Sequence, residues 1–205
     1  MQSWQGKHLL ILSAVIVGAA VILLAIPLRL SDRPAPEDNA PAELPPPEPA
    51  PSLAPTRAIP DAFPSNTHRP NVKESIASGA IDLGTFSAGR DLMYIDDARV
   101  WWESDNDTND TEDDHTIHAS LELPLRRLIE LVTERGGTLK VQDCFRASGV
   151  HNKRSLHKEG RAIDLTCDEL GLETLARLCW AAGFDWVYHE RRSRGGAHVH
   201  CSVKR

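Results

Sequence analysis

Apolar positions in the carboxy-terminal half of the chain repeat at two spacings. A first stripe recurs every three or four residues, at Leu121, Leu125, Leu128 and Val132. This spacing predicts a helix that ends at the glycines 136–137. A second stripe of this kind, closed by Gly183, comprises Leu172, Leu175, Ala176 and Cys179. Residues 138–142, 161–166, 184–188 and 197–203 read as strands. The order of these elements predicts an α+β fold with a mainly antiparallel sheet and flanking helices.

Two of the predicted strands carry ligand-type side chains on one face. Asp164 lies on the polar face of the first, and His198 and His200 share the polar face of the other. If the strands are neighbours, Asp164 and His200 meet, and His157 enters from the preceding loop. Two imidazoles and a carboxylate leave one position open on a zinc ion, as hydrolytic zinc sites require. The alternative is that these are ordinary surface histidines on half-buried strands.

The amino-terminal part of the chain predicts a location. Residues 9–28 form a stretch of twenty residues without charge, long enough to span a bilayer as a helix. Residues 34–64 hold eleven of the fourteen prolines, a composition that favours extended conformations. We therefore expect a membrane anchor over residues 1–30, a disordered linker over 31–70 and a single domain over 71–205. A cleaved signal peptide is the alternative to the anchor.

Charge is unevenly spread along the chain. The net charge is −6, yet residues 96–114 contain nine acids and one arginine. Without a basic stripe, and with few aromatic residues, the chain is not expected to bind nucleic acid. The acidic run lacks the glycine and glutamate of an EF-hand loop, so a solvated surface loop is the better interpretation. A second metal cluster at Asp113, Asp114, His115 and His118 is a weaker alternative.

The chain resembles two related families from Ser155 to Lys204. The segments SLHKEGRAIDL, LARL, AGFDWVYHE and AHVHCSVK resemble the amino-terminal signalling domain of hedgehog proteins. The same ligand layout occurs in the zinc D-alanyl-D-alanine peptidases and murein endopeptidases, whose fold the hedgehog domains share. The resemblance implies that His157, Asp164 and His200 are zinc ligands.

The peptidase side of this resemblance implies an activity. Glu190 would be the general base, and His198 and His151 would stabilise the oxyanion. Arg146, in a segment similar to the peptidases' Tyr-Arg-Ser element, would hold a substrate carboxylate. We therefore predict a membrane-anchored zinc metallopeptidase that cleaves D-amino-acid peptide bonds of peptidoglycan. Its domain would be monomeric and would lie in the periplasm or extracytoplasmic space.

Other interpretations remain open at this point. The chain could be a catalytically inactive, zinc-containing binding module of hedgehog type that acts at the cell wall or surface. For Arg146, a loop arginine or a salt bridge is the alternative. The four cysteines, Cys144, Cys167, Cys179 and Cys201, permit disulfides in an exported chain, although buried free thiols are equally compatible with the pattern.

Overall fold

The computed structural model describes residues 51–103, 112–147, 153–191 and 196–205. The strands are β1 (His68–Arg69), β2 (Leu92–Tyr94), β3 (Val100–Trp102), β4 (Glu112–Asp113), β5 (Thr116–His118), β6 (Leu139–Asp143), β7 (Phe145–Arg146), β8 (Ala162–Thr166), β9 (Trp186–Arg191) and β10 (Ala197–Ser202). The helices are α1 (Glu74–Ala77), α2 (Ala88–Asp91), α3 (Glu122–Thr133) and α4 (Gly171–Ala182). Two 3-10 helices, η1 (Ala119–Leu121) and η2 (Leu156–Glu159), complete the described elements.

A six-stranded sheet forms the centre of the domain, in the order β1-β9-β10-β8-β6-β3. Neighbouring strands run antiparallel except for β3 and β6, which are parallel. Two further sheets pair β2 with β5 and β4 with β7. The prediction of an α+β fold with a mainly antiparallel sheet is therefore confirmed at this level.

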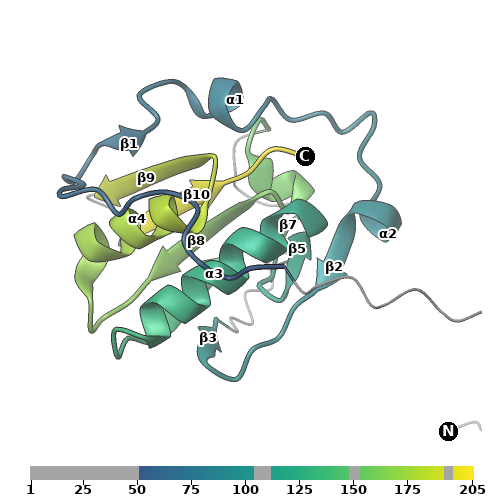
Figure 1. Cartoon of the computed structure of the whole chain (residues 1–205). Helices are drawn as coiled ribbons and strands as arrows, with labels where there is room; N and C mark the ends of the chain where they lie inside the picture. Colours follow the sequence, from purple (N-terminus) through teal and green to yellow (C-terminus); the bar gives the residue numbers. More distant parts are fainter. Residues whose placement is uncertain (1–50, 104–111, 148–152, 192–195) are drawn as a thin grey trace, which may run out of the picture. The chain divides into compact units, whose positions relative to one another are not determined.

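Helices α3 and α4 pack together on one face of the sheet (Figure 1). Their apolar stripes and the inward residues of β8 and β10 form one core, which includes Leu128, Leu175, Ile163 and Val199. Gly183 ends α4 in the left-handed conformation, with φ of 105°, which glycine adopts without steric cost. This packing turns the polar residues of β8 and β10 toward the opposite face.

Residues 51–70 pack against the domain, although a linker was predicted to extend to residue 70. Phe63 is fully buried, and the backbone N–H of Thr56 donates to the carbonyl of Ala181 at 2.9 Å. His68 and Arg69 pair with β9 as an outer strand. The compact unit therefore begins near Pro49, before the predicted boundary. The proline content of the segment did not reveal this packing, because it depends on the buried ring of Phe63 and on the two-residue strand β1.

The predicted membrane span over residues 9–28 lies outside the described residues. Among residues from 51 onward that the structure describes, no helix has the length and apolar character needed to cross a bilayer. The four cysteines are buried free thiols, so no disulfide links the described elements.

Candidate metal centre

Strands β8 and β10 bring two ligand-type side chains face to face. His200 and Asp164 are register partners in this antiparallel pair, and Asp164 Oδ1 lies 2.7 Å from His200 Nδ1. The neighbouring partners Cys201 and Ile163 point into the core and are fully buried. Apolar packing on one face thus fixes the register that joins the two polar groups on the other.

His157 enters this site from η2, just before β8. Ser155 caps η2 by accepting the backbone N–H of His157 at 3.4 Å. Gly160 ends η2 with φ of 66°, and a Cβ added there would lie 2.8 Å from the backbone nitrogen of His118. Only glycine fits this close approach, which turns the chain from η2 into β8.

The three side chains form a set that could hold a metal ion. One ligand atom from each of His157, Asp164 and His200 lies within 4.8 Å of the others. His157 Nε2 is 3.6 Å from Asp164 Oδ1, while its Nδ1 is 2.8 Å from the carbonyl oxygen of Cys144. A carbonyl can only accept, so it holds the proton on Nδ1 and directs the Nε2 lone pair into the site. This donor set fits a divalent ion.

The electrostatics of the centre favour a bound cation. Burial alone would raise the pKa of Asp164, but His157 and His200 hold it well below its usual range. Burial alone would lower the pKa of His200, but Asp164 and Glu74 raise it to about 10. In both cases the neighbouring groups of opposite charge outweigh desolvation, so the carboxylates of the site stabilise positive charge beside them.

Glu74 also belongs to this centre, and the sequence did not reveal it. Its Oε1 lies 2.7 Å from His200 Nε2, on the side of the ring away from Asp164. The two residues are 126 positions apart. Glu74 is in the four-residue helix α1, which has no buried residue and hence no apolar stripe to signal it.

Glu190 and His198 lie together beside the ligand set. They are register partners on β9 and β10, and His198 Nε2 is 3.3 Å from Glu190 Oε2. The same nitrogen is 3.5 Å from Asp164 Oδ2. The structure thus brings both residues next to the candidate metal ligands. His151, the other residue predicted to act on an oxyanion, lies outside the described residues.

Arg146 is connected to the ligand set through Asp143. Its Nη2 is 3.4 Å from Asp143 Oδ2, and Asp143 Oδ1 is 3.5 Å from His157 Nδ1. The arginine side chain is only 10% exposed. This placement agrees with the salt-bridge alternative. A guanidinium so buried and beside a carboxylate of its own chain is poorly disposed to hold the carboxylate of a substrate.

The alternative cluster near the acidic run does not form a comparable centre in the described part of the chain. His115 Nδ1 lies 3.0 Å from the carbonyl oxygen of Ile95, and His118 Nδ1 lies 2.8 Å from Ser120 Oγ. Among described residues, the single group with metal-ligand spacing is His157, Asp164 and His200.

The fold and this site together define an α+β domain with a candidate metal centre on the face of the sheet opposite the helices. Residues 61–202 match the family model of the hedgehog amino-terminal signalling domain. The chain therefore belongs to the hedgehog signalling-domain family.

Individual relatives agree with this assignment. The chain is 50% identical over 72 residues to Indian hedgehog B protein of Danio rerio, a match that covers 34% of this chain and 16% of the relative. It is 47% identical over 72 residues to Sonic hedgehog protein of the same species, covering 34% and 16%. For protein hedgehog of Drosophila hydei the identity is 39% over 72 residues, covering 34% and 14%. The matched region thus spans a small part of each relative.

The predicted activity is wrong. The family is a signalling domain and the relatives are hedgehog proteins, which contradicts a zinc metallopeptidase acting on peptidoglycan peptides. The catalytic roles predicted for Glu190, His198 and His151, and the substrate role of Arg146, lose their basis with it. The spacing of the ligands indicates which ion a fold can hold. It does not indicate whether a substrate or a partner protein binds at the open coordination position of that ion. The alternative of a hedgehog-type binding module is closer to the family, and an extracytoplasmic location is consistent with it.

Proposed function

We propose that this chain is a zinc-containing recognition domain of hedgehog type that acts outside the cytoplasm by binding a protein partner. The observation that carries the proposal is the three-ligand centre of His157, Asp164 and His200 in a signalling-domain family. Two imidazole nitrogens and a carboxylate oxygen are ligands that suit zinc. Bound zinc would cross-link η2, β8 and β10 and would act as a Lewis acid toward a group at its open position.

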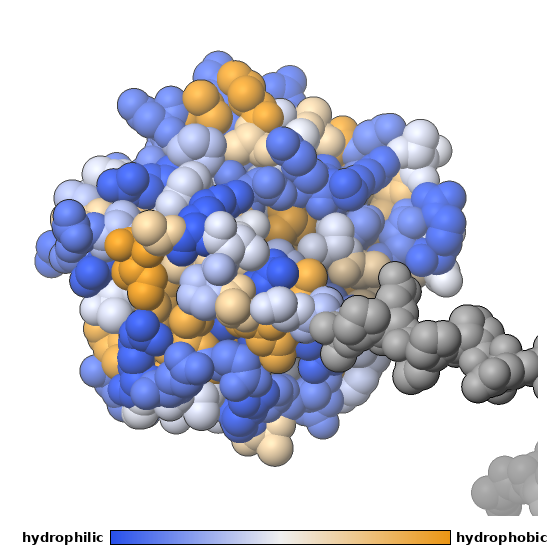
Figure 2. Space-filling view, viewed as in Figure 1, coloured by the Kyte–Doolittle hydropathy of each residue, from blue (hydrophilic) through white to orange (hydrophobic). Residues whose placement is uncertain are grey.

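The surface beside the centre supports binding of a protein. Ile76 on α1 is 67% exposed, and Val72 just before the helix is 37% exposed. Figure 2 shows apolar surface over α1 at the top of the view, next to hydrophilic surface. Exposed apolar side chains beside a polar site are typical of recognition surfaces. Glu190 and His198 would contribute polar groups to the same region.

Two measurements test the proposal. Elemental analysis of the purified chain should find about one zinc ion per molecule, because the centre supplies one ligand set. Biolayer interferometry should then detect saturable binding of the zinc-loaded chain to the ectodomain of a cell-surface receptor. A His157→Ala/His200→Ala variant is the matched control and should bind neither zinc nor receptor. A zinc-free wild-type chain, or equal receptor binding by the double variant, would contradict the proposal.

The anchor over residues 9–28 stays a prediction, because the described residues do not include it. The Pro-rich segment before residue 51 would then separate the domain from the membrane.

A further inference from the structure

We propose that Glu74 is a positioning residue of the metal centre. Its carboxylate accepts the Nε2–H of His200 and thereby keeps the Nδ1 lone pair of that ring directed at the ion. This inference rests on the proposed metal-binding function and deepens it. It assigns a role to a residue that has no metal-ligand spacing in the sequence.

The geometry at His200 supports this role. The two ring nitrogens face opposite carboxylates: Nδ1 is 2.7 Å from Asp164 Oδ1, and Nε2 is 2.7 Å from Glu74 Oε1. A neutral imidazole carries one N–H, and an ionised carboxylate can only accept. Because Nδ1 faces the other ligands, the metal-competent ring must carry its proton on Nε2, where Glu74 holds it. Hydrogen-bonded partners of this kind fix the orientation of ligating histidines.

Helix α1 is held in place from both sides of Glu74. Before the helix, the indole N–H of Trp186 donates to the carbonyl of Val72 at 2.9 Å. After it, the hydroxyls of Ser78 and Ser202 are 2.8 Å apart, and both residues are buried. Since α1 buries no residue of its own, these contacts and the bond to His200 set its position. The carboxylate of Glu74 is therefore fixed relative to β10, as a positioning role requires.

The two ligand histidines have different outer partners. Nδ1 of His157 bonds to the neutral carbonyl of Cys144 at 2.8 Å, whereas Nε2 of His200 bonds to the charged carboxylate of Glu74. A carboxylate increases the basicity of the opposite ring nitrogen more than a carbonyl does. Loss of Glu74 should therefore weaken the metal bond of His200 in particular.

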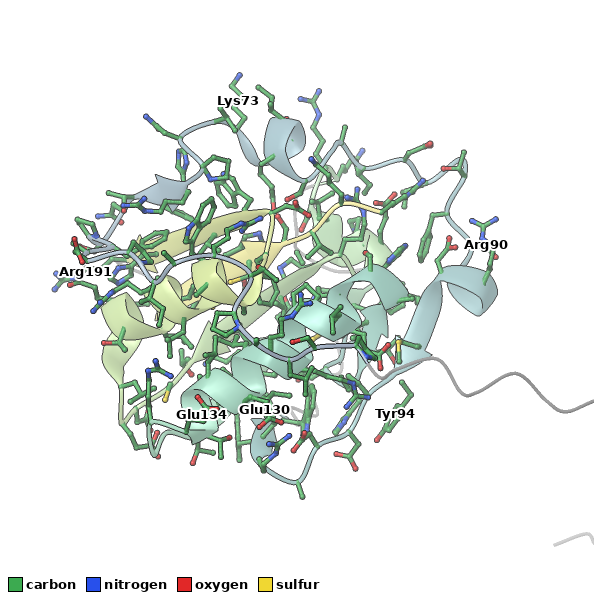
Figure 3. The ribbon with its side chains drawn as sticks, in the orientation of Figure 1. Lys73, Arg90, Tyr94, Glu130, Glu134 and Arg191 are labelled. Carbon is green, nitrogen blue, oxygen red and sulfur yellow. The ribbon has the colours of Figure 1, made fainter. Side chains whose placement is uncertain are left out.

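The test compares three full-length chains: wild type, Glu74→Gln and the control Glu134→Gln. Glu134 is at the end of α3, its side chain is 67% exposed, and its nearest cation, Arg135, is 3.9 Å away. Figure 3 places it far from Lys73, the residue before Glu74. Zinc affinity is measured by competition with a chelating dye. We expect Glu74→Gln to bind zinc about 10–100-fold more weakly, and the control to match wild type.

A second readout separates positioning from a structural effect. Long-range proton–nitrogen NMR spectra of the zinc-loaded chains report which nitrogen of each histidine carries the proton. The wild type should show a hydrogen-bonded Nε2–H at His200, and this signal should shift in Glu74→Gln while that of His157 does not. Unchanged zinc affinity together with an unchanged His200 signal would overturn the role of Glu74. Failure of the wild type itself to bind zinc would instead overturn the proposed metal centre.

Discussion

The side chains of His200 and Asp164 face each other across β10 and β8, with Nδ1 and Oδ1 separated by 2.7 Å. The register of these two strands is fixed by the buried residues next to the pair, Cys201 and Ile163. Core packing therefore determines the geometry of the candidate centre. The apolar faces of β8 and β10 set the register of the two strands, and their polar faces supply the ligands. Changes to ligands, to the turn before β8 and to the polar contacts around α1 should therefore have separable effects.

Removal of one ligand should abolish metal binding. His157 is buried and would supply one of three protein ligands, so His157→Ala should reduce bound zinc from about one ion per chain to near none. Elemental analysis after dialysis measures this. His115→Ala is a matched control, since the ring of His115 bonds to the carbonyl of Ile95 instead. Equal zinc content in both variants would exclude His157 as a ligand.

Zinc should stabilise the folded chain in proportion to its free concentration. Because the unfolded chain does not hold the three ligands together, the free energy of unfolding should rise by about 1.4 kcal/mol for each tenfold increase of free zinc above Kd. Urea unfolding in zinc buffers checks this slope. A chelator should remove the zinc-dependent part of the wild-type stability, and the stability of His157→Ala/His200→Ala should not depend on zinc. A flat dependence in the wild type would argue against a metal ligated only in the native fold.

Gly160→Ala should be costly for two reasons that a control can separate. Alanine at φ of 66° costs about 1–2 kcal/mol, and its Cβ would also meet the backbone nitrogen of His118 at 2.8 Å. Gly136 has φ of 74° and no atom within 4 Å of an added Cβ, so Gly136→Ala shows the conformational cost alone. Chemical unfolding should give a larger loss for Gly160→Ala, by about 1–3 kcal/mol. Equal losses would mean that the turn before β8 tolerates the added methyl group.

Arg161 should matter for stability far more than an exposed arginine. It is 1% exposed, bonds to the fully buried carboxylate of Glu159 at 2.6 Å, and donates to the carbonyls of Ser78 and Val203. Arg161→Met would remove one of the two arginines that pair with the buried carboxylate of Glu159, the other being Arg205, at a cost of about 3–5 kcal/mol. Thermal and urea unfolding measure this loss.

The control for this substitution is Arg90→Met, whose side chain is 67% exposed in its pair with Asp91. It should change stability little, because solvent screens exposed ion pairs. A small effect of Arg161→Met would show that the arginine next to Glu159 is replaceable. Because Arg161 bonds to Ser78, the residue after α1, its loss should also disturb the position of Glu74.

The sequence predicted the parts of the fold that repeat. The stripe around Leu128 and the alternation around Asp164 and His200 produce α3, β8 and β10, because period and burial coincide in these elements. Phe63 and the two-residue strand β1 are too short to show a hydrophobic repeat. Their packing depends on residues that are far away in the sequence, such as those of β9. The segment before residue 71 was therefore assigned to a linker.

The candidate site was predicted in part for a similar reason. His157, Asp164 and His200 lie close enough in sequence, or on strands regular enough, to be placed together from pattern alone. Glu74 reaches His200 across 126 positions and from a helix of four residues, so no local signal reports it. The activity was misjudged because the prediction inferred hydrolysis from the spacing of the ligands. Side-chain spacing carries no information about what approaches the ion.

The outer strand β1 has a practical consequence for recombinant fragments. A fragment that starts at residue 71 would omit His68 and Arg69 and leave the edge of β9 without its neighbour. It would also omit Phe63 and leave a hole where that ring is enclosed. An exposed strand edge next to an apolar cavity favours self-association of the fragment. A fragment for expression should therefore start upstream of Pro49, where the compact unit starts.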